Sequence, residues 1–320
     1  MIRLAAEWEK QKSIIVVFPT KHKDWQHSIE EIQKSYANFI KTIIKFQKCI
    51  VICDTPKILN DYFDSFENIE IYELDTNDTW IRDFGAIDIW INDELKSYNF
   101  KFNAWGDKFE SSLDDSFNIR FSTNNLIDID FILEGGSIDS NGHGTIISTE
   151  RCIFNSNRNS TCKEKEIIQT IKDLFGLKEL IVLKHGFLLG DDTDAHIDTL
   201  VRFIDQDTIA YIKCCDTNDT HYKELEKMGK ELEKTELKLV PLPMPNPKYY
   251  KNKRLPVTYL NFVFINGALI VPTYNDNNDS KAIEILKEHV KNREIVGVDA
   301  SVFVREGGSL HCSCINKYEI

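Results

Sequence analysis

Five residues of this chain have side chains that could act together in nucleophilic chemistry: Asp83, Glu134, His196, Asp198 and Cys312. A thiol can attack an electrophilic carbon, an imidazole can transfer the protons, and carboxylates can hold a cationic reactant. Taken singly, each residue has a structural interpretation, since a lone Cys usually packs as a small apolar residue. Together they supply a nucleophile, a base and three carboxylates, and that combination favours an active site.

Each of these residues lies in an unusual polar or glycine-rich string. The strings are Asn77-Asp-Thr-Trp-Ile-Arg-Asp83, Glu134-Gly-Gly, Asp191-Asp-Thr-Asp-Ala-His-Ile-Asp198 and Glu306-Gly-Gly-Ser-Leu-His-Cys312. His196 and Asp198 could also be ligands of a metal-dependent hydrolase. No cysteine pairs have the spacing of a zinc site, however, and nothing else in the sequence completes one. We therefore expect neither a metal nor an organic cofactor.

The elements that position these residues follow from hydrophobic periodicity. Residues 28–47 have the apolar spacing of a helix with one buried face, and Ser28 with Glu31 forms an expected capping box. Short β-branched runs at 14–18 and 49–53 predict buried strands on either side of this helix.

A unit of hairpin, helix and strand then recurs along the chain. One copy has hairpin arms at 196–204 and 208–214, a helix at 222–234 and a strand at 237–242. The corresponding segments of two further copies are 259–265, 268–273, 280–290 and 295–299, and 136–152, 163–175 and 179–183. A unit that begins near residue 85 contains an apparent inserted loop at 103–125, and the prolines at 241–247 predict an extended loop.

The starts of the hairpins are regularly spaced. Asp83, Glu134, His196, Tyr259 and Cys312 follow one another at intervals of 51, 62, 63 and 53 positions. Such self-similarity indicates modules packed around a common axis. The last unit lacks a helix and the N-terminal segment supplies a strand, a helix and a strand, so the two ends can complete one module. We expect a single cyclic domain over residues 1–320, with the site at its centre.

Composition narrows the classes of partner. The chain has 51 acidic and 39 basic residues and a net charge of −12, whereas nucleic acid and anionic membranes require a basic footprint. No apolar run reaches the length of a membrane helix, and the N-terminus lacks the features of a signal peptide. We expect a cytoplasmic protein with reduced cysteines that binds neither nucleic acid nor membrane, and a homo-oligomer is compatible with the sequence.

As an ordered set, these strings resemble those of the agmatine deiminases in the guanidine-modifying superfamily, which also includes bacterial peptidylarginine deiminases. The resemblance extends from about residue 6 to residue 312. Further matching strings are Ala6-Glu7-Trp8-Glu9, Asn141-Gly-His-Gly-Thr145, Thr149-Glu-Arg-Cys152, residues 155–159 and Tyr259-Leu-Asn-Phe262. The resemblance implies a five-module α/β propeller, which agrees with the recurring unit. Ala86 replaces a usual proline, and the residues from Cys314 to Lys317 replace a usual polar tail.

The resemblance also implies a role for each residue of the site. Cys312 would be the nucleophile and His196 the acid and base, while Asp83 and Asp198 would hold a guanidinium and Glu134 would orient the histidine. A guanidinium is planar and permanently charged, so two carboxylates can fix its plane through paired hydrogen bonds. The bound cation should also favour the thiolate of the nucleophile.

The expected substrate is agmatine, whose distal ammonium an acidic wall can receive. The candidates for that wall are Glu7, Asp191, Asp192 and Asp194. Of these, Glu7 and Asp192, together with Trp80, are the further residues that we expect to contact substrate. Three alternatives stay open at this point. They are a deiminase of free or peptidyl arginine, an amidinotransferase that shares the covalent step, and a binding module with a decayed site.

Overall fold

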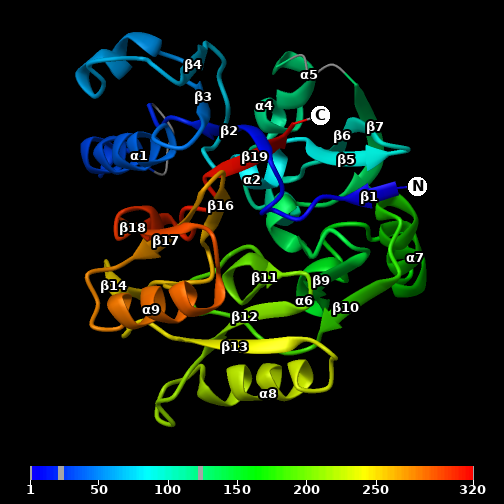
Figure 1. Ribbon diagram of the computed structural model, residues 1–320. Coiled ribbons are helices and arrows are strands. Elements are labelled where there is room, and N and C mark those ends of the chain that lie inside the picture. The colour runs from blue at the N-terminus through cyan, green and yellow to red at the C-terminus, as the bar shows by residue number, and fades with distance from the viewer. Residues whose placement is uncertain (1, 21–24, 122–124, 320) are drawn as a thin grey trace.

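Three-stranded units of one pattern recur in the computed structural model, which describes residues 2–20, 25–121 and 125–319 (Figure 1). In one unit β11 (Val201–Asp205) pairs antiparallel with β12 (Thr208–Lys213), and β12 pairs in parallel with β13 (Lys238–Pro243). Helix α8 (Tyr222–Leu232) connects the two parallel strands and covers the sheet. A parallel pair needs such a crossover, which explains why each hairpin is followed by a helix.

The same pattern is found in three further units. The first consists of β16 (Val263–Ile265), β17 (Ala268–Thr273), α9 (Asp279–His289) and β18 (Glu294–Asp299). The second consists of β8 (Asp139–Ser140), β9 (Thr145–Thr149), α7 (Glu164–Phe175) and β10 (Glu179–Leu183). The third consists of β5 (Ile87–Ile91), β6 (Glu94–Lys101) and β7 (Leu126–Ile132), with β1 (Ile2–Leu4) added beside β5.

The fifth unit is assembled from both ends of the chain. Strand β19 (Cys314–Tyr318) pairs antiparallel with β2 (Gln11–Val17), and β3 (Lys48–Ile52) and β4 (Ile69–Tyr72) follow in parallel. Figure 1 shows the red C-terminal strand beside the blue β2. The predictions of a closing module and of a five-module α/β propeller are confirmed, although the five sheets stay separate.

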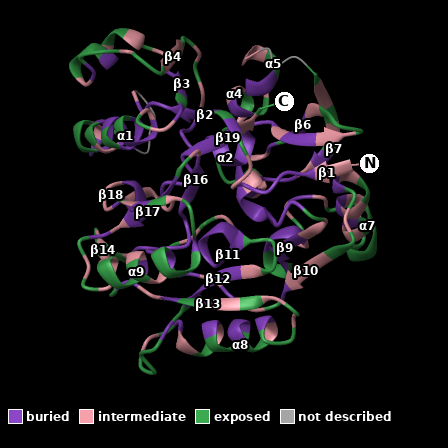
Figure 2. Ribbon diagram, viewed as in Figure 1, coloured by how far each residue is buried: buried purple, intermediate pink, exposed green. Residues whose placement is uncertain are grey.

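The helices lie on the outside of the sheets and bury one face each. Along α1 (Ile29–Ile43) the inward residues, among them Ile32, Tyr36 and Phe39, have no exposed surface. Figure 2 shows the same division on α8 and α9, where buried and exposed stretches alternate along each helix. Burial of these apolar faces is the main stabilising contribution to the modules.

Three predictions about elements need correction. Ser28 precedes α1 but its side chain does not cap the helix, because its backbone (φ −142°, ψ 23°) is not extended as a capping residue requires. The prolines at 241 and 243 lie inside β13 rather than in a loop, since β13 is an edge strand whose outer side needs no donor. Strand β16 begins only at Val263, because the carbonyls of Leu260 and Phe262 accept hydrogen bonds from Arg202 instead of pairing in the sheet.

Short elements complete the fold. The inserted segment folds into α3 (Ala104–Asp107), α4 (Ser112–Asp115) and α5 (Phe117–Phe121), and positions 122–124 of that predicted loop lie outside the described residues. The others are α2 (Ile81–Phe84), α6 (Glu150–Ile153), the pair β14 (Tyr249–Tyr250) and β15 (Lys253–Arg254), and the 3-10 turns η2 (Pro56–Asp61), η3 (Gly135–Ser137), η4 (Ile197–Thr199) and η5 (Phe303–Glu306). Within the described part of the chain, no helix is both long and apolar enough to cross a membrane.

Candidate active site

The starts of the modules bring all five candidate side chains to the centre of the molecule. Asp83 lies on α2, Glu134 precedes η3, His196 and Asp198 flank the start of η4, and Cys312 stands two residues before β19. All five are buried. The five residues lie on or next to short helical turns, or just before a strand, and their side chains point toward the centre.

Gly136 marks the point where three of these side chains converge. A Cβ atom at this position would lie 2.7 Å from His196 Nδ1, 2.8 Å from Asp83 Oδ1 and 3.2 Å from Asp198 Oδ2. The backbone N–H of Gly136 donates to Asp83 Oδ1 at 2.9 Å. Only glycine allows this close approach, which gives the Glu134-Gly-Gly string a physical reason.

The two oxygens of the Asp198 carboxylate have different surroundings. Its Oδ2 accepts from His311 Nδ1 at 2.8 Å and from Asn261 Nδ2 at 3.0 Å, and lies 3.6 Å from Cys312 Sγ. Its Oδ1 is buried and accepts no hydrogen bond from any residue that the structure describes. Because a buried acceptor without a partner is costly, this oxygen indicates a ligand that donates to it.

The second carboxylate, Asp83, is also held from two sides. Besides the Gly136 N–H, the indole N–H of Trp105 on the inserted segment donates to Asp83 Oδ2 at 2.9 Å. Burial raises the pKa of Asp83, and the neighbouring carboxylate of Asp198 adds to this, while His196 opposes it. A cation bound between the two carboxylates would relieve this unfavourable environment.

His196 lies between two carboxylates without bonding to either. Its Nδ1 is 3.6 Å from Asp83 Oδ1 and its Nε2 is 3.9 Å from Glu134 Oε2, and neither nitrogen has a hydrogen-bond partner among the described residues. Burial alone lowers the pKa of His196, but Asp83, Cys152 and Glu134 outweigh it and raise that pKa well above its ordinary value. The imidazole therefore carries a proton that it can deliver.

Glu134 is bound by an arginine that had no assigned role. Arg158 Nε donates to both carboxylate oxygens of Glu134, at 2.8 and 2.9 Å, and both side chains are buried. Glu134 is thereby fixed near His196, at the distance of an ion pair rather than of a hydrogen bond. Its predicted role of orienting the histidine stays a prediction.

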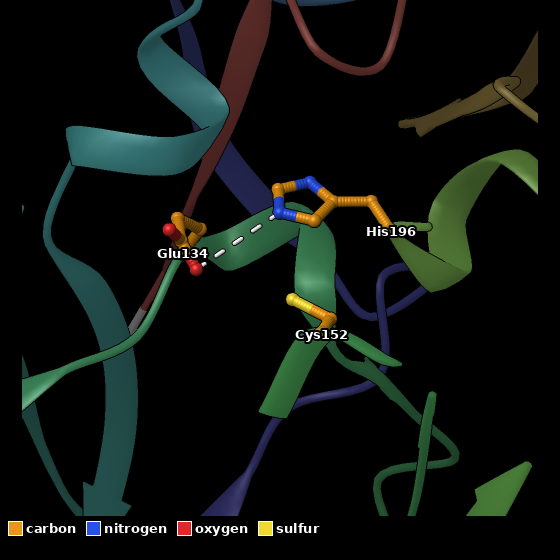
Figure 3. A group of neighbouring side chains, drawn as sticks. All are labelled: Glu134, Cys152 and His196. Atoms are coloured by element: carbon orange, nitrogen blue, oxygen red, sulfur yellow. Dashed lines mark ion pairs between the residues drawn. The ribbon is translucent and has the colours of Figure 1, made fainter. Parts of the chain in front are cut away.

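Cys152 joins Glu134 and His196 in a cluster whose ligand atoms lie within 4.8 Å of one another (Figure 3). By residue type and distance this cluster could hold a metal ion. Both oxygens of Glu134 already bind Arg158, however, and that guanidinium would repel a second cation at the same carboxylate. We assign no metal to the cluster.

Cys312 is the thiol that faces the carboxylates. Asn261 Nδ2 lies 3.2 Å from its Sγ. Burial raises the pKa of the Cys312 thiol well above its ordinary value, and the negative charges of Asp198 and Asp83 raise it further. The unliganded site therefore holds a neutral thiol, and a bound cation would shift it toward the thiolate.

Four of the five candidate residues line one pocket at this centre, and Glu134 lies outside its lining. The pocket is lined by Asp78, Trp80, Asp83, Trp105, Phe109, Asp191, Asp192, Thr193, His196, Asp198, Thr199, Glu306, Gly307, Gly308 and Cys312. Trp80 and Asp192, which we expected to contact substrate, are both in its wall. Burial and the neighbouring Asp191 raise the pKa of Asp192 to about 6, so it is an anion at neutral pH. Asp194 is absent from this lining and pairs with Arg158 and Lys108.

Glu7 lies elsewhere, and the prediction that it contacts substrate is wrong. It does not line this pocket, and its carboxylate accepts from Arg202 Nη2 at 2.8 Å and from the Phe264 N–H at 2.7 Å, with His311 Nε2 at 2.7 Å. These contacts occupy its oxygens behind the catalytic residues. From the sequence, the acidic side chain of Glu7 could equally line the substrate pocket or form a buried ion pair, and residue type alone does not distinguish the two.

Sequence reasoning assigned no role to four residues that shape the site: Trp105, Arg158, Asn261 and His311. Three of them stand inside strings that carry the family resemblance, so a signal was present. Trp105 stands in the segment expected to be an inserted loop, where only its residue type could have suggested a role.

Comparison with known proteins identifies the family of the chain. The sequence profile of the Porphyromonas-type peptidyl-arginine deiminases matches residues 3–317. The chain belongs to this family. Among curated relatives, the agmatine deiminase of Pseudomonas aeruginosa (strain LESB58) is 28% identical over 352 residues, which cover 97% of this chain and 94% of the relative.

Solved structures of the family superpose closely on the chain. A serine variant of the C. jejuni agmatine deiminase, solved with substrate bound, has a TM-score of 0.97 and 48% identity, over 100% of this chain and 97% of that one. The agmatine deiminase of Enterococcus faecalis has a TM-score of 0.91 and 26% identity, over 99% and 96% of the two chains.

Proposed function

We propose that this protein is an agmatine deiminase, which hydrolyses agmatine to N-carbamoylputrescine and ammonia. The proposal rests on the convergence of a thiol, an imidazole and two buried carboxylates, in which the imidazole nitrogens and one carboxylate oxygen have no hydrogen-bond partner among the described residues. A planar cation with several N–H donors satisfies this set, and a guanidinium has that shape and charge. The named activity of two similar solved proteins supports the same substrate.

The first half of the reaction forms a covalent adduct. Asp83 and Asp198 hold the guanidinium so that its carbon faces Cys312, and the added positive charge favours the thiolate, which forms when the thiol releases its proton to solvent. Sulfur attacks the carbon, and the resulting tetrahedral adduct has a nitrogen that must leave. His196 gives this nitrogen its proton, ammonia departs, and the substrate remains bound to Cys312 as a thiouronium.

The second half returns the enzyme to its starting state. His196, now neutral, takes a proton from water as the oxygen attacks the thiouronium carbon. The carbon–sulfur bond breaks as the remaining hydroxyl proton of the adduct passes to the departing sulfur, so the Cys312 thiol is regenerated and the product carries a urea group in place of the guanidinium. His196 thus serves as acid and then as base, which is consistent with its lack of a permanent hydrogen-bond partner among the described residues.

The acidic wall supports agmatine over arginine. Asp191 and Asp192 line the same pocket as the catalytic residues, and Asp192 is an anion at neutral pH. The distal ammonium of agmatine would be attracted to these carboxylates. The α-carboxylate of free arginine would be repelled unless a cation offset it, so the wall disfavours that substrate.

The test compares kcat/KM for agmatine, free arginine and a blocked arginine peptide by ammonia release. We expect agmatine to be preferred. Preference for either arginine form would refute the substrate while leaving the Cys312 chemistry intact. Transfer of the amidino group to an added amine, in place of ammonia release into water, would instead establish an amidinotransferase.

Cys312→Ala should abolish turnover and leave the protein folded, as measured by ammonia release and circular dichroism. Cys314→Ala is the matched control, because Cys314 is equally buried two residues away but does not line the pocket. This control should keep most of its activity. An active Cys312→Ala variant would exclude the covalent mechanism.

A further inference from the structure

We infer that His311, held in place by Glu7, is a positioning residue that fixes Asp198 for the guanidinium. This inference rests on the proposed function, since it assigns a task within the same reaction. His311 itself lies behind Asp198, and it is absent from the lining of the catalytic pocket. It would act through the carboxylate rather than by touching substrate.

The geometry of His311 is that of a bridge between two carboxylates. Its Nδ1 is 2.8 Å from Asp198 Oδ2 and its Nε2 is 2.7 Å from Glu7 Oε2, and all three side chains are buried. An ionised carboxylate only accepts hydrogen bonds, so both contacts are satisfied when both ring nitrogens carry hydrogen. The ring then donates to an anion at each end.

Glu7 is itself held rigidly. Arg202 Nη2 donates to Glu7 Oε2 at 2.8 Å, and Arg202 Nε donates to Asp139 Oδ1 at 3.0 Å. Arg202 also donates to the carbonyl of Phe262 at 2.8 Å. A series of alternating charges therefore runs from the substrate-binding carboxylate to residues of three modules and the N-terminal segment, and it fixes the ring of His311.

The consequence for Asp198 is that its two oxygens have different tasks. Oδ2 is bound by His311 and Asn261, so the carboxylate cannot rotate without losing those bonds. Oδ1 is left buried and unbound by the described residues, ready for a substrate N–H. Burial tends to raise the pKa of Asp198, but His311 outweighs it and the pKa is lowered, which keeps the carboxylate ionised.

Other charged groups face the same pair from several elements. Around Asp198 and His311 these are Glu7, Arg82, Asp83, Asp139, His196, Arg202 and the Cys312 thiol. Among them His311 is the group with a charge-assisted hydrogen bond to Asp198. Removal of the imidazole should therefore affect Asp198 more than any other carboxylate except Glu7.

The test is the pH profile of kcat/KM for agmatine in His311→Gln. In the wild type, the acidic limb should report one carboxyl, because burial raises the pKa of Asp83 whereas that of Asp198 is lowered. Without the imidazole the pKa of Asp198 should rise, because the carboxylate loses its short hydrogen bond to the ring. The limb should then move to higher pH and become steeper, since two carboxyls titrate.

Two further variants keep the result interpretable. Glu7→Gln should move the limb in the same direction by a smaller amount, because it frees the far side of His311. His221→Gln is the matched control, since this buried histidine pairs with Asp219 at 2.9 Å and has no contact with Asp198 among the described residues. Its acidic limb should coincide with that of the wild type.

Binding gives a second measurement if turnover of His311→Gln is too low. In a Cys312→Ser background, calorimetry should show that His311→Gln weakens agmatine binding, and more strongly at pH 5.5 than at pH 8. A uniform loss at every pH, with the limb unmoved, would overturn the inference and leave a merely structural role. Failure of the wild type to release ammonia from agmatine would instead contradict the proposed function.

Discussion

The reactivity of Cys312 depends on what occupies the space between Asp83 and Asp198. Burial raises the pKa of the thiol, and the charges of both carboxylates raise it further. A guanidinium bound to the same carboxylates would cancel their charge and add its own. The thiol is therefore unreactive until the substrate arrives, which protects a buried nucleophile from unwanted alkylation and oxidation.

This property predicts slow alkylation of Cys312 in the free protein. Iodoacetamide at pH 7.5 should modify the exposed Cys215 first, as quantified by mass spectrometry of the peptides, and Cys312 should react faster as the pH rises above 9. Cys152, which is also buried, controls for access because it lies outside the pocket lining. Rapid modification of Cys312 at neutral pH would show that its thiolate forms without substrate.

At this scale the sequence revealed which residues gather but not how they are held. The glycine-rich and polar strings predicted Cys312, His196 and the carboxylates correctly as neighbours. The bond from Arg158 to Glu134 spans 24 positions and that from His311 to Asp198 spans 113. A single sequence contains no signal for such pairs, because the fold alone decides which buried charge meets which.

The inserted segment between β6 and β7 is the element that completes the site. Ala104 and Trp105 have positive φ angles of 47° and 57°, followed by Gly106 at 96°. Such a run of left-handed residues is strained for non-glycine residues, and it directs the indole of Trp105 onto Asp83. A segment expected to be only an insertion therefore supplies a hydrogen-bond donor to Asp83, a carboxylate of the proposed active site.

We predict that Trp105→Phe and Gly106→Ala both lower kcat/KM for agmatine. Loss of the indole donor should cost about 1.5–3 kcal/mol, or roughly 10- to 150-fold, as for other hydrogen bonds to charged groups. A methyl group at Gly106 would lie 2.1 Å from the side chain of Asn157 and should displace the same segment.

Trp90→Phe is the matched control for this pair. The indole N–H of Trp90 on β5 has no partner in the described part of the chain, so its removal breaks no hydrogen bond. This variant should retain wild-type kinetics. Unchanged kcat/KM in Trp105→Phe would show that Asp83 does not depend on the insertion.

The boundaries of helices and strands were predicted well where apolar residues recur at the period of the element. They were predicted poorly where contacts with residues distant in sequence decide the backbone conformation. The predicted helix at 222–234 is observed at Tyr222–Leu232, and the strand at 268–273 is observed without change. The predicted strand at 259–265 lost its first residues, because the carbonyls of Leu260 and Phe262 turn to Arg202. The sequence around residues 259–265 gives no indication that Arg202 will bind these carbonyls.

The whole molecule is organised by its repeats, and the regular spacing of polar residues was the signal that predicted it. Each module contributes a short turn to the centre, so residues from Asp83 to Cys312 meet although they lie far apart in sequence. The pairing of β19 with β2 closes the arrangement and fixes Cys312 directly before the closing strand.

The charge of the whole molecule leads to the last prediction. At pH 7 the chain carries a net charge of −12, and Asp191 and Asp192 lie in the wall of the catalytic pocket. Such a field attracts doubly charged agmatine, and salt screens it over about 10 Å at 0.1 M. The buried contacts of the bound guanidinium are screened much less.

Raising NaCl from 20 to 500 mM should therefore raise KM several-fold and leave kcat nearly unchanged, as measured by initial rates of ammonia release. Sucrose at equal osmolarity is the control and should have little effect on KM. A KM that is independent of salt would mean that the acidic wall does not attract the distal ammonium, whereas a parallel fall in kcat would mean that salt disturbs the catalytic residues themselves.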